Sequence, residues 1–137
     1  MVHALEKVKP WLVPGGYILI VHDLVTPPRI EVHAQGQHKY AGQLFSDSGF
    51  ENQRMADQAI DQVVQGGLFS SSQSHIFENY DRADSLTSLL VWLAETWEST
   101  YMTDGTKRKI NDLVEQMGWE SEVVLHMLTR IVKLDPI

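Results

Sequence analysis

Residues 14–21 read Pro14-Gly15-Gly16-Tyr17-Ile18-Leu19-Ile20-Val21, a turn followed at once by an unbroken apolar run. Glycine accepts the positive φ angles of a tight reversal, and an unbroken apolar run is typical of a strand covered on both faces in a parallel sheet. The sequence therefore predicts a buried strand over residues 17–21. A helix over residues 2–9, stopped by Pro10, is expected to lead into the turn.

Five further segments downstream predict regular structure, three helices from their periodicity and two strands mainly from their composition. Apolar residues at helical spacing predict helices near residues 54–65, from Asp84 to Trp97 and over residues 106–117, with glycines after the first and the last. Segments 74–80 and 122–133 are rich in β-branched and other apolar residues and predict two more strands. We therefore expect an α/β fold with three main strands and flanking helices.

The stretch from residue 24 to residue 54 has no sustained period and collects two prolines and three glycines. Such punctuation is typical of loops, and structureless stretches of this length are usually functional or mobile. We predict a long loop or a substrate arm over residues 24–54. The chain as a whole, residues 1–137, has the length of one domain with a single core.

Composition excludes several function classes. The net charge of -7 opposes binding to nucleic acid, and no window approaches the ~18 apolar residues that a membrane span requires. The chain has no cysteine, which rules out disulfides, thiolate zinc sites and a cysteine nucleophile. The first seven residues do not resemble a signal peptide, so we expect a cytoplasmic location.

The order of elements and several motifs carry a family resemblance. Residues 5–20, a helix that ends in Leu12-Val13-Pro14-Gly15-Gly16 before a strand, resemble the segment through the fifth strand of class I S-adenosylmethionine-dependent methyltransferases. Residues 66–90 are similar to the sixth strand and next helix of trans-aconitate methyltransferase-like members, and residues 108–133 to the last helix and seventh strand. The resemblance implies a partial Rossmann-like sheet of order first, third, second, with the last strand antiparallel.

The same resemblance sets expectations about activity. Family members transfer a methyl group from S-adenosylmethionine, and for this chain the resemblance implies a small molecule as the acceptor. They hold the cofactor with a Gly-rich loop after their first strand. This sequence contains no Gly-x-Gly-x-Gly segment. We therefore expect a truncated methyltransferase-like chain, the C-terminal half, with no cofactor-binding residues and no activity alone. The alternative is an interaction module that completes a sheet with a partner chain.

Few residues are candidates for chemistry. His22 and Asp23 follow the first strand, at the kind of strand end where ligands bind in α/β sheets, and His22 could act as a base or an orienting group. A polar strand end capped by its own loop is the alternative. Glu31, His33 and His38 have zinc or copper ligand types, but a spacing of five in an irregular loop is no known ligand pattern, so no metal site is predicted. A third hypothesis is an unrelated small enzyme that uses the region of His22, Asp23, His33 and His38.

One edge of the predicted first strand indicates a protein partner. In a complete methyltransferase the fifth strand pairs on one side with the fourth strand, which has no counterpart in this sequence. The Tyr17 to Val21 strand would then present an apolar edge with unpaired backbone groups. We therefore predict a homodimer, or a partner chain, that covers this edge.

Overall fold

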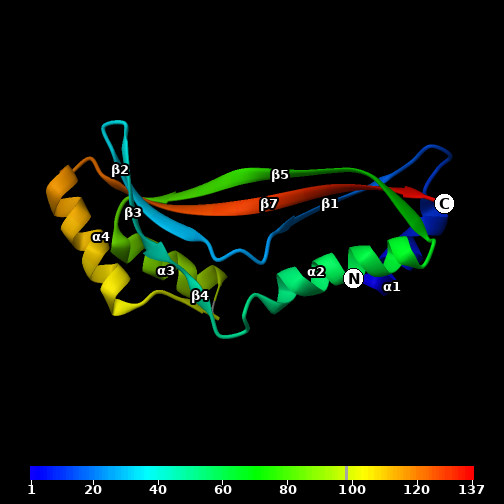
Figure 1. Ribbon diagram of the computed structural model, residues 1–137, viewed down its shortest axis with the longest axis horizontal. Coiled ribbons are helices and arrows are strands. Elements are labelled where there is room, and N and C mark those ends of the chain that lie inside the picture. Colours follow the sequence, from blue (N-terminus) through cyan, green and yellow to red (C-terminus); the bar gives the residue numbers. More distant parts are fainter. Residues whose placement is uncertain (98) are drawn as a thin grey trace. The chain divides into compact units, whose positions relative to one another are not determined.

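The computed structural model describes residues 1–97 and 99–137, which divide into two compact units (Figure 1). The first unit comprises residues 1–25, 50–77 and 128–137, and the second comprises residues 26–49 and 78–127. Two long strands, β5 (Phe69–Ala83) and β7 (Glu122–Pro136), contribute to both. The chain is thus α/β, with mixed helices and antiparallel strand pairing.

In the first unit, two helices cover one face of the strands. The elements are α1 (Val2–Val8), the short 3-10 helix η1 (Lys9–Trp11), β1 (Ile18–Asp23) and α2 (Glu51–Gln65), together with parts of β5 and β7. β1 pairs antiparallel with β7, from Ile18 opposite Leu134 to Asp23 opposite Thr129. The helices and strands enclose a core of Leu5, Ile60, Val63, Phe69, Val132 and Leu134.

The prediction that the first strand is covered on both faces in a parallel sheet is wrong. Ile18 and Ile20 pack against the core, whereas Leu19 and Val21 are 52% and 58% exposed. The partner of β1 is the antiparallel β7. An unbroken apolar run satisfies a strand with one covered face as well as one with two, so the run alone does not set the sheet type.

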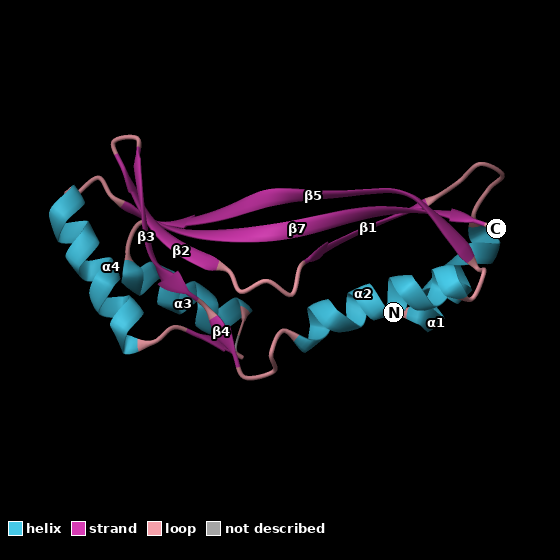
Figure 2. Cartoon of the chain, viewed as in Figure 1, coloured by secondary structure: helices cyan, strands magenta, loops and turns pink. Residues whose placement is uncertain are grey.

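The second unit has its own sheet and helices. Its elements are β2 (Arg29–Ala34), β3 (Gln37–Gln43), β4 (Phe45–Ser46), α3 (Leu86–Thr96), β6 (Thr100–Tyr101) and α4 (Asp104–Met117) (Figure 2). β2 pairs antiparallel with β3 on one side and with the first part of β7 on the other, while β4 pairs with β6. The core contains Ile30, Val32, Ala41, Leu44, Leu89, Leu93, Met102, Ile110, Leu113, Val123, Leu125 and Met127.

The prediction of a loop over residues 24–54 is also wrong, because this segment forms β2, β3, β4 and the first turn of α2. Ile30, Val32 and Ala34 alternate with polar residues and are buried, as a half-covered strand requires. Gln35 and Gly36 both have positive φ, 50° and 75°, which is the geometry of a two-residue hairpin turn. The alternation was present in the sequence, but the surrounding prolines and glycines obscured it.

The predicted helices are confirmed, with small shifts at their starts. α2 and α4 begin two or three residues earlier than expected, and α4 is capped by Thr103, whose hydroxyl accepts from the amide of Thr106. α3 is capped by Ser85 rather than by Asp84. Among the described residues, no helix combines the length and apolar character needed to cross a membrane.

Strand β7 has more neighbours than predicted. It pairs with β1, β2 and β5. The strands expected at residues 17–21, 74–80 and 122–133 are all present, as β1, β5 and β7. The expectation of three main strands is too low, because β2 and β3 join the same pairing network.

A pair of substitutions on α3 tests the helix packing. Leu89 is 2% exposed in the core, whereas Val91 is 53% exposed on the same helix. We expect Leu89→Asp to lower the free energy of unfolding by about 3 to 5 kcal/mol, because it buries an unpaired carboxylate, and Val91→Asp to change it by less than about 0.5 kcal/mol. Urea unfolding followed by far-ultraviolet circular dichroism measures both. Equal stability of the two variants would contradict the assigned buried face.

Candidate functional site

The end of β1 brings His22 together with two residues that the sequence did not single out. His22 follows Ile18 and Ile20 on the face that α2 covers, and its side chain is only 9% exposed. Its Nε2 lies 3.3 Å from Oδ1 of Asp57 on α2. Arg130, which is opposite His22 in the β1–β7 register, donates from Nη1 to the same Oδ1 at 3.0 Å. These three residues form the β1-end cluster.

The β1-end cluster holds an imidazole beside a carboxylate. The Nε2 atom of His22 is buried and makes no hydrogen bond of good geometry within the described residues, so its contact with Asp57 is an ion-pair distance only. The Nδ1 atom lies 3.1 Å from the backbone oxygen of Asp23. A histidine beside a carboxylate is a common arrangement for proton transfer or for orienting a polar ligand. In the β1-end cluster both ring nitrogens of His22 lie beside protein oxygens, Nε2 beside Asp57 and Nδ1 beside the backbone of Asp23.

Asp23 has a different environment from His22. Thr129, which is 4% exposed and opposite Asp23 in the register, donates from Oγ1 to Oδ1 of Asp23 at 2.8 Å. Neighbouring strand residues point to opposite faces, so the side chains of His22 and Asp23 diverge. The carboxylate of Asp23 has a structural partner across the strands. Of the two candidates, Asp23 fits the alternative of a capped polar strand end.

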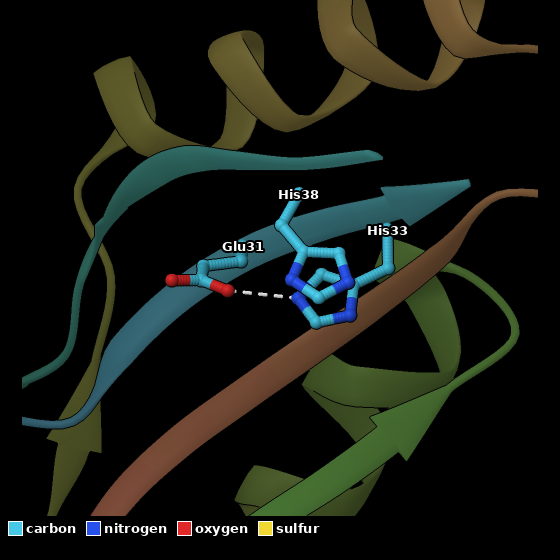
Figure 3. A group of neighbouring side chains, drawn as sticks. All are labelled: Glu31, His33 and His38. Atoms are coloured by element: carbon cyan, nitrogen blue, oxygen red, sulfur yellow. Dashed lines mark hydrogen bonds and ion pairs between the residues drawn. The ribbon is translucent and has the colours of Figure 1, made fainter. Parts of the chain in front are cut away.

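The β2–β3 hairpin brings together the three metal-ligand types noted in the sequence (Figure 3). Glu31 and His33 are two residues apart on β2, and His33 Nε2 lies 2.8 Å from Glu31 Oε2. His38 on β3 is the register partner of His33, and the two rings stack with centroids 3.7 Å apart and planes 4° from parallel. The spacing of five is therefore a direct cross-strand pair, because a two-residue turn separates the strands. We call Glu31, His33 and His38 the hairpin cluster.

Glu31 is the charged centre of the hairpin cluster. Its side chain is 13% exposed, and Nη2 of Arg29 donates to its Oε1 at 3.1 Å. The hydrogen bond from His33 holds the pKa of Glu31 below its usual value, against the opposing effect of burial, and the positive charge of Arg29 lowers this pKa further. Glu31 is consequently a carboxylate at neutral pH, with one oxygen on Arg29 and the other on His33.

A second histidine–carboxylate contact lies in the same unit. Tyr80 on β5 donates from its hydroxyl to Oε2 of Glu78 at 2.6 Å, and this bond raises the pKa of Tyr80. The Tyr80 ring stacks on His126 of β7 at 4.6 Å, and His126 Nε2 lies 3.5 Å from the same Glu78 oxygen. Both ring nitrogens of His126 are buried and lack a hydrogen bond to the described residues. Nothing in the sequence signalled this group, because its members are up to 48 residues apart.

Comparison of the chain with family models, with curated proteins and with solved structures finds no match.

The hydrogen bond between His33 and Glu31 makes a titration prediction. In His33→Ala the pKa of Glu31 should rise toward its ordinary value of 4.5, and in Arg29→Ala it should rise less, because the hydrogen bond is the larger cause. The folded-state pKa is lowered, so the carboxylate stabilises the fold above the unfolded pKa and this contribution is lost as the pH falls through the folded pKa. Carboxyl-carbon NMR titration measures the shift. An unchanged Glu31 pKa in His33→Ala would contradict the assigned bond.

Proposed function

We propose that this chain is the C-terminal half of a class I methyltransferase-like fold and supplies the acceptor side of the reaction, without activity alone. The observation that carries the proposal is the pairing of β7 with both β1 and β5, with β7 antiparallel to β1. Of the three strands expected from the sequence, the last one, β7, thus pairs with the other two, which supports the order that the resemblance implies; β2 and β3 are additional to it. The turn at Pro14-Gly15-Gly16, with φ +79° at Gly15, leads from the helical segment into β1 as expected in that family.

The residues present do not fit the cofactor. The chain has no Gly-x-Gly-x-Gly segment, and the resemblance matches none of its acidic residues to the one that holds the ribose hydroxyls in the family. No residue is therefore assigned to S-adenosylmethionine, and no catalytic step is derived through it. The proposed reaction class, methyl transfer to a small molecule, rests on the resemblance and on the strand order.

His22 is the residue to which we assign a role in this reaction. It lies at the carboxyl end of β1, where the related enzymes place the acceptor beside the loop after the fifth strand. Asp57, which Arg130 bonds, lies 3.3 Å from Nε2 of the His22 ring, and we assign to His22 the role of accepting a proton from the acceptor or of orienting it. Asp23, bonded to Thr129, is assigned the positioning of this strand end.

Titration calorimetry tests the proposal in two steps. The isolated chain should show no measurable affinity for S-adenosylmethionine, and a micromolar Kd would contradict the proposal. The second step reads the genomic DNA upstream of Met1, which should encode a Gly-rich first strand in frame with this chain. The polypeptide that includes that strand should bind S-adenosylmethionine and transfer the methyl group. In that protein His22→Ala should lower kcat by about 100-fold without changing cofactor affinity. Upstream DNA without such a strand would also contradict the proposal.

A control variant guards this measurement. His75→Ala removes an exposed histidine of β5, outside the β1-end cluster, and should leave kcat unchanged. If His75→Ala lowers kcat as much as His22→Ala does, the assigned role of His22 is wrong.

A second candidate function, assembly through β1, is favoured by a specific observation. Among the described residues β1 pairs with β7 alone, and Tyr17, Leu19 and Val21 are each more than half exposed. Exposed apolar strand edges are seldom left open. Residues 17–21 carry no charge, so two copies can pair antiparallel there without like charges meeting, despite the net charge of -7. The occupant proposed for this edge is a second copy of the chain.

Light scattering at low micromolar concentration tests the dimer. The chain should have twice its monomer mass, and the double variant Leu19→Lys, Val21→Lys should be monomeric because two charges repel across the two-fold axis. Ile18 and Ile20 are unsuitable for this test, since they pack into the core. Val91→Lys, an exposed apolar position on α3, is the matched control and should remain dimeric. A monomeric parent chain would contradict this candidate function.

A further inference from the structure

The hairpin cluster is not used by the proposed methyl transfer, yet its side chains are those of a metal site. Glu31 and His33 lie on the same face of β2, since they are two residues apart, and His38 lies directly opposite His33 on β3. Each of the three residues offers one ligand atom, and these atoms all lie within 4.8 Å of one another. Imidazole nitrogens and a carboxylate oxygen are ligands that zinc prefers.

We propose that Glu31, His33 and His38 bind one divalent transition-metal ion, zinc being the best match, with a fourth position open to solvent. In a tetrahedral zinc site, bonds of about 2.0 to 2.2 Å place the ligand atoms roughly 3.3 Å from one another. No two ligand atoms of the hairpin cluster are more than 4.8 Å apart, and the His33 Nε2 and Glu31 Oε2 atoms, at 2.8 Å, need to separate slightly to reach this spacing. Three protein ligands and one open position are the arrangement of zinc sites that bind water or substrate.

The stacked rings show which ligand must move. A metal ion lies in the plane of each imidazole that binds it, so one ion cannot be bound by two rings whose planes are 4° from parallel and 3.7 Å apart. His38 is exposed, and no hydrogen bond or ion pair to a described residue holds its ring. His33 is buried and bonded to Glu31. The ring of His38 therefore turns on binding, while Glu31 and His33 need only a small separation of their ligand atoms.

The proton balance is straightforward. The Nε2–H of His33 donates to Glu31 Oε2. When the ion binds, the Nε2 proton leaves to solvent and Nδ1 takes up a proton from solvent, so His33 stays a neutral imidazole, and bonds form from the ion to Nε2 and to Oε2. Arg29 stays on the other carboxylate oxygen and orients the ligand, as outer partners commonly do in metal sites. Its positive charge also reduces the affinity, so binding should be moderate rather than very tight.

Zinc titration of the isolated chain tests the site independently of methyl transfer, because it needs neither the cofactor nor a longer polypeptide. We expect one zinc ion per chain. His38→Ala and Glu31→Gln should each weaken binding by at least about tenfold, since loss of an outer partner alone costs that much. Arg29→Ala should change the affinity less than either variant, because removal of its positive charge offsets the loss of its orienting bond to Glu31. His33 is left intact because it is buried, and circular dichroism checks the fold of each variant.

Two observations would overturn the metal site. His75→Ala removes an exposed histidine of the first unit and should bind zinc like the parent chain. Equal affinities of the parent, His38→Ala and Glu31→Gln, or a loss in His75→Ala as large as in His38→Ala, would show non-specific binding. Cobalt substitution gives a second readout, because a site with four ligands produces intense visible absorption that should disappear in His38→Ala. A cobalt spectrum typical of six water ligands in the parent chain would contradict the site.

Discussion

The backbone pairing of β7 is the constraint on which the rest of the structure depends. This strand pairs with β1 through its second half and with β2 through its first half, and β5 is its third partner. Val123, Leu125 and Met127 contribute to the core of the second unit, and Val132 and Leu134 to that of the first. Each core therefore needs β7 in its observed register. A shift by one residue would turn these side chains to the opposite face.

The alternation of side chains along a strand places the core residues and the polar residues of β2 on opposite faces. On β2, Ile30 and Val32 enter the core, so Glu31 and His33 must lie on the opposite face. On β1, Ile18 and Ile20 pack against the helices, and His22 extends the same row to the cluster with Asp57. The two candidate sites thus arise differently. The hairpin cluster lies on the face away from the core, whereas the β1-end cluster lies where the packed face of the strand ends.

The two clusters also differ in how their charges are compensated. In the β1-end cluster one carboxylate oxygen of Asp57 contacts both a histidine and an arginine, so the negative charge is shared between two groups. In the hairpin cluster the two oxygens of Glu31 have separate partners, Arg29 and His33. A carboxylate that keeps one oxygen on a fixed cation can exchange the partner of the other without losing its orientation. This difference favours the hairpin cluster as a binding site for a cation. It favours the β1-end cluster as the site of the proposed base, His22.

Function cannot be taken from the fold alone, because one fold supports many activities. The methyltransferase resemblance concerns the order of elements and the turn before β1, neither of which touches a reacting atom. The side-chain clusters bear more directly on chemistry. The proposals for His22 and for Glu31, His33 and His38 rest on these contacts.

The sequence by itself determined the helices and the two terminal strands. Helical periodicity and the residues at the helix ends depend on neighbours a few positions away, so α2, α3 and α4 were predicted nearly to their ends. Only the tertiary structure decided the pairing partners. The exposure of Leu19, the alignment of His33 with His38, and the meeting of His22 with Asp57 and Arg130 all depend on it. Strand register and helix docking join segments that are distant in the chain, and local patterns carry little information about which distant segments will meet.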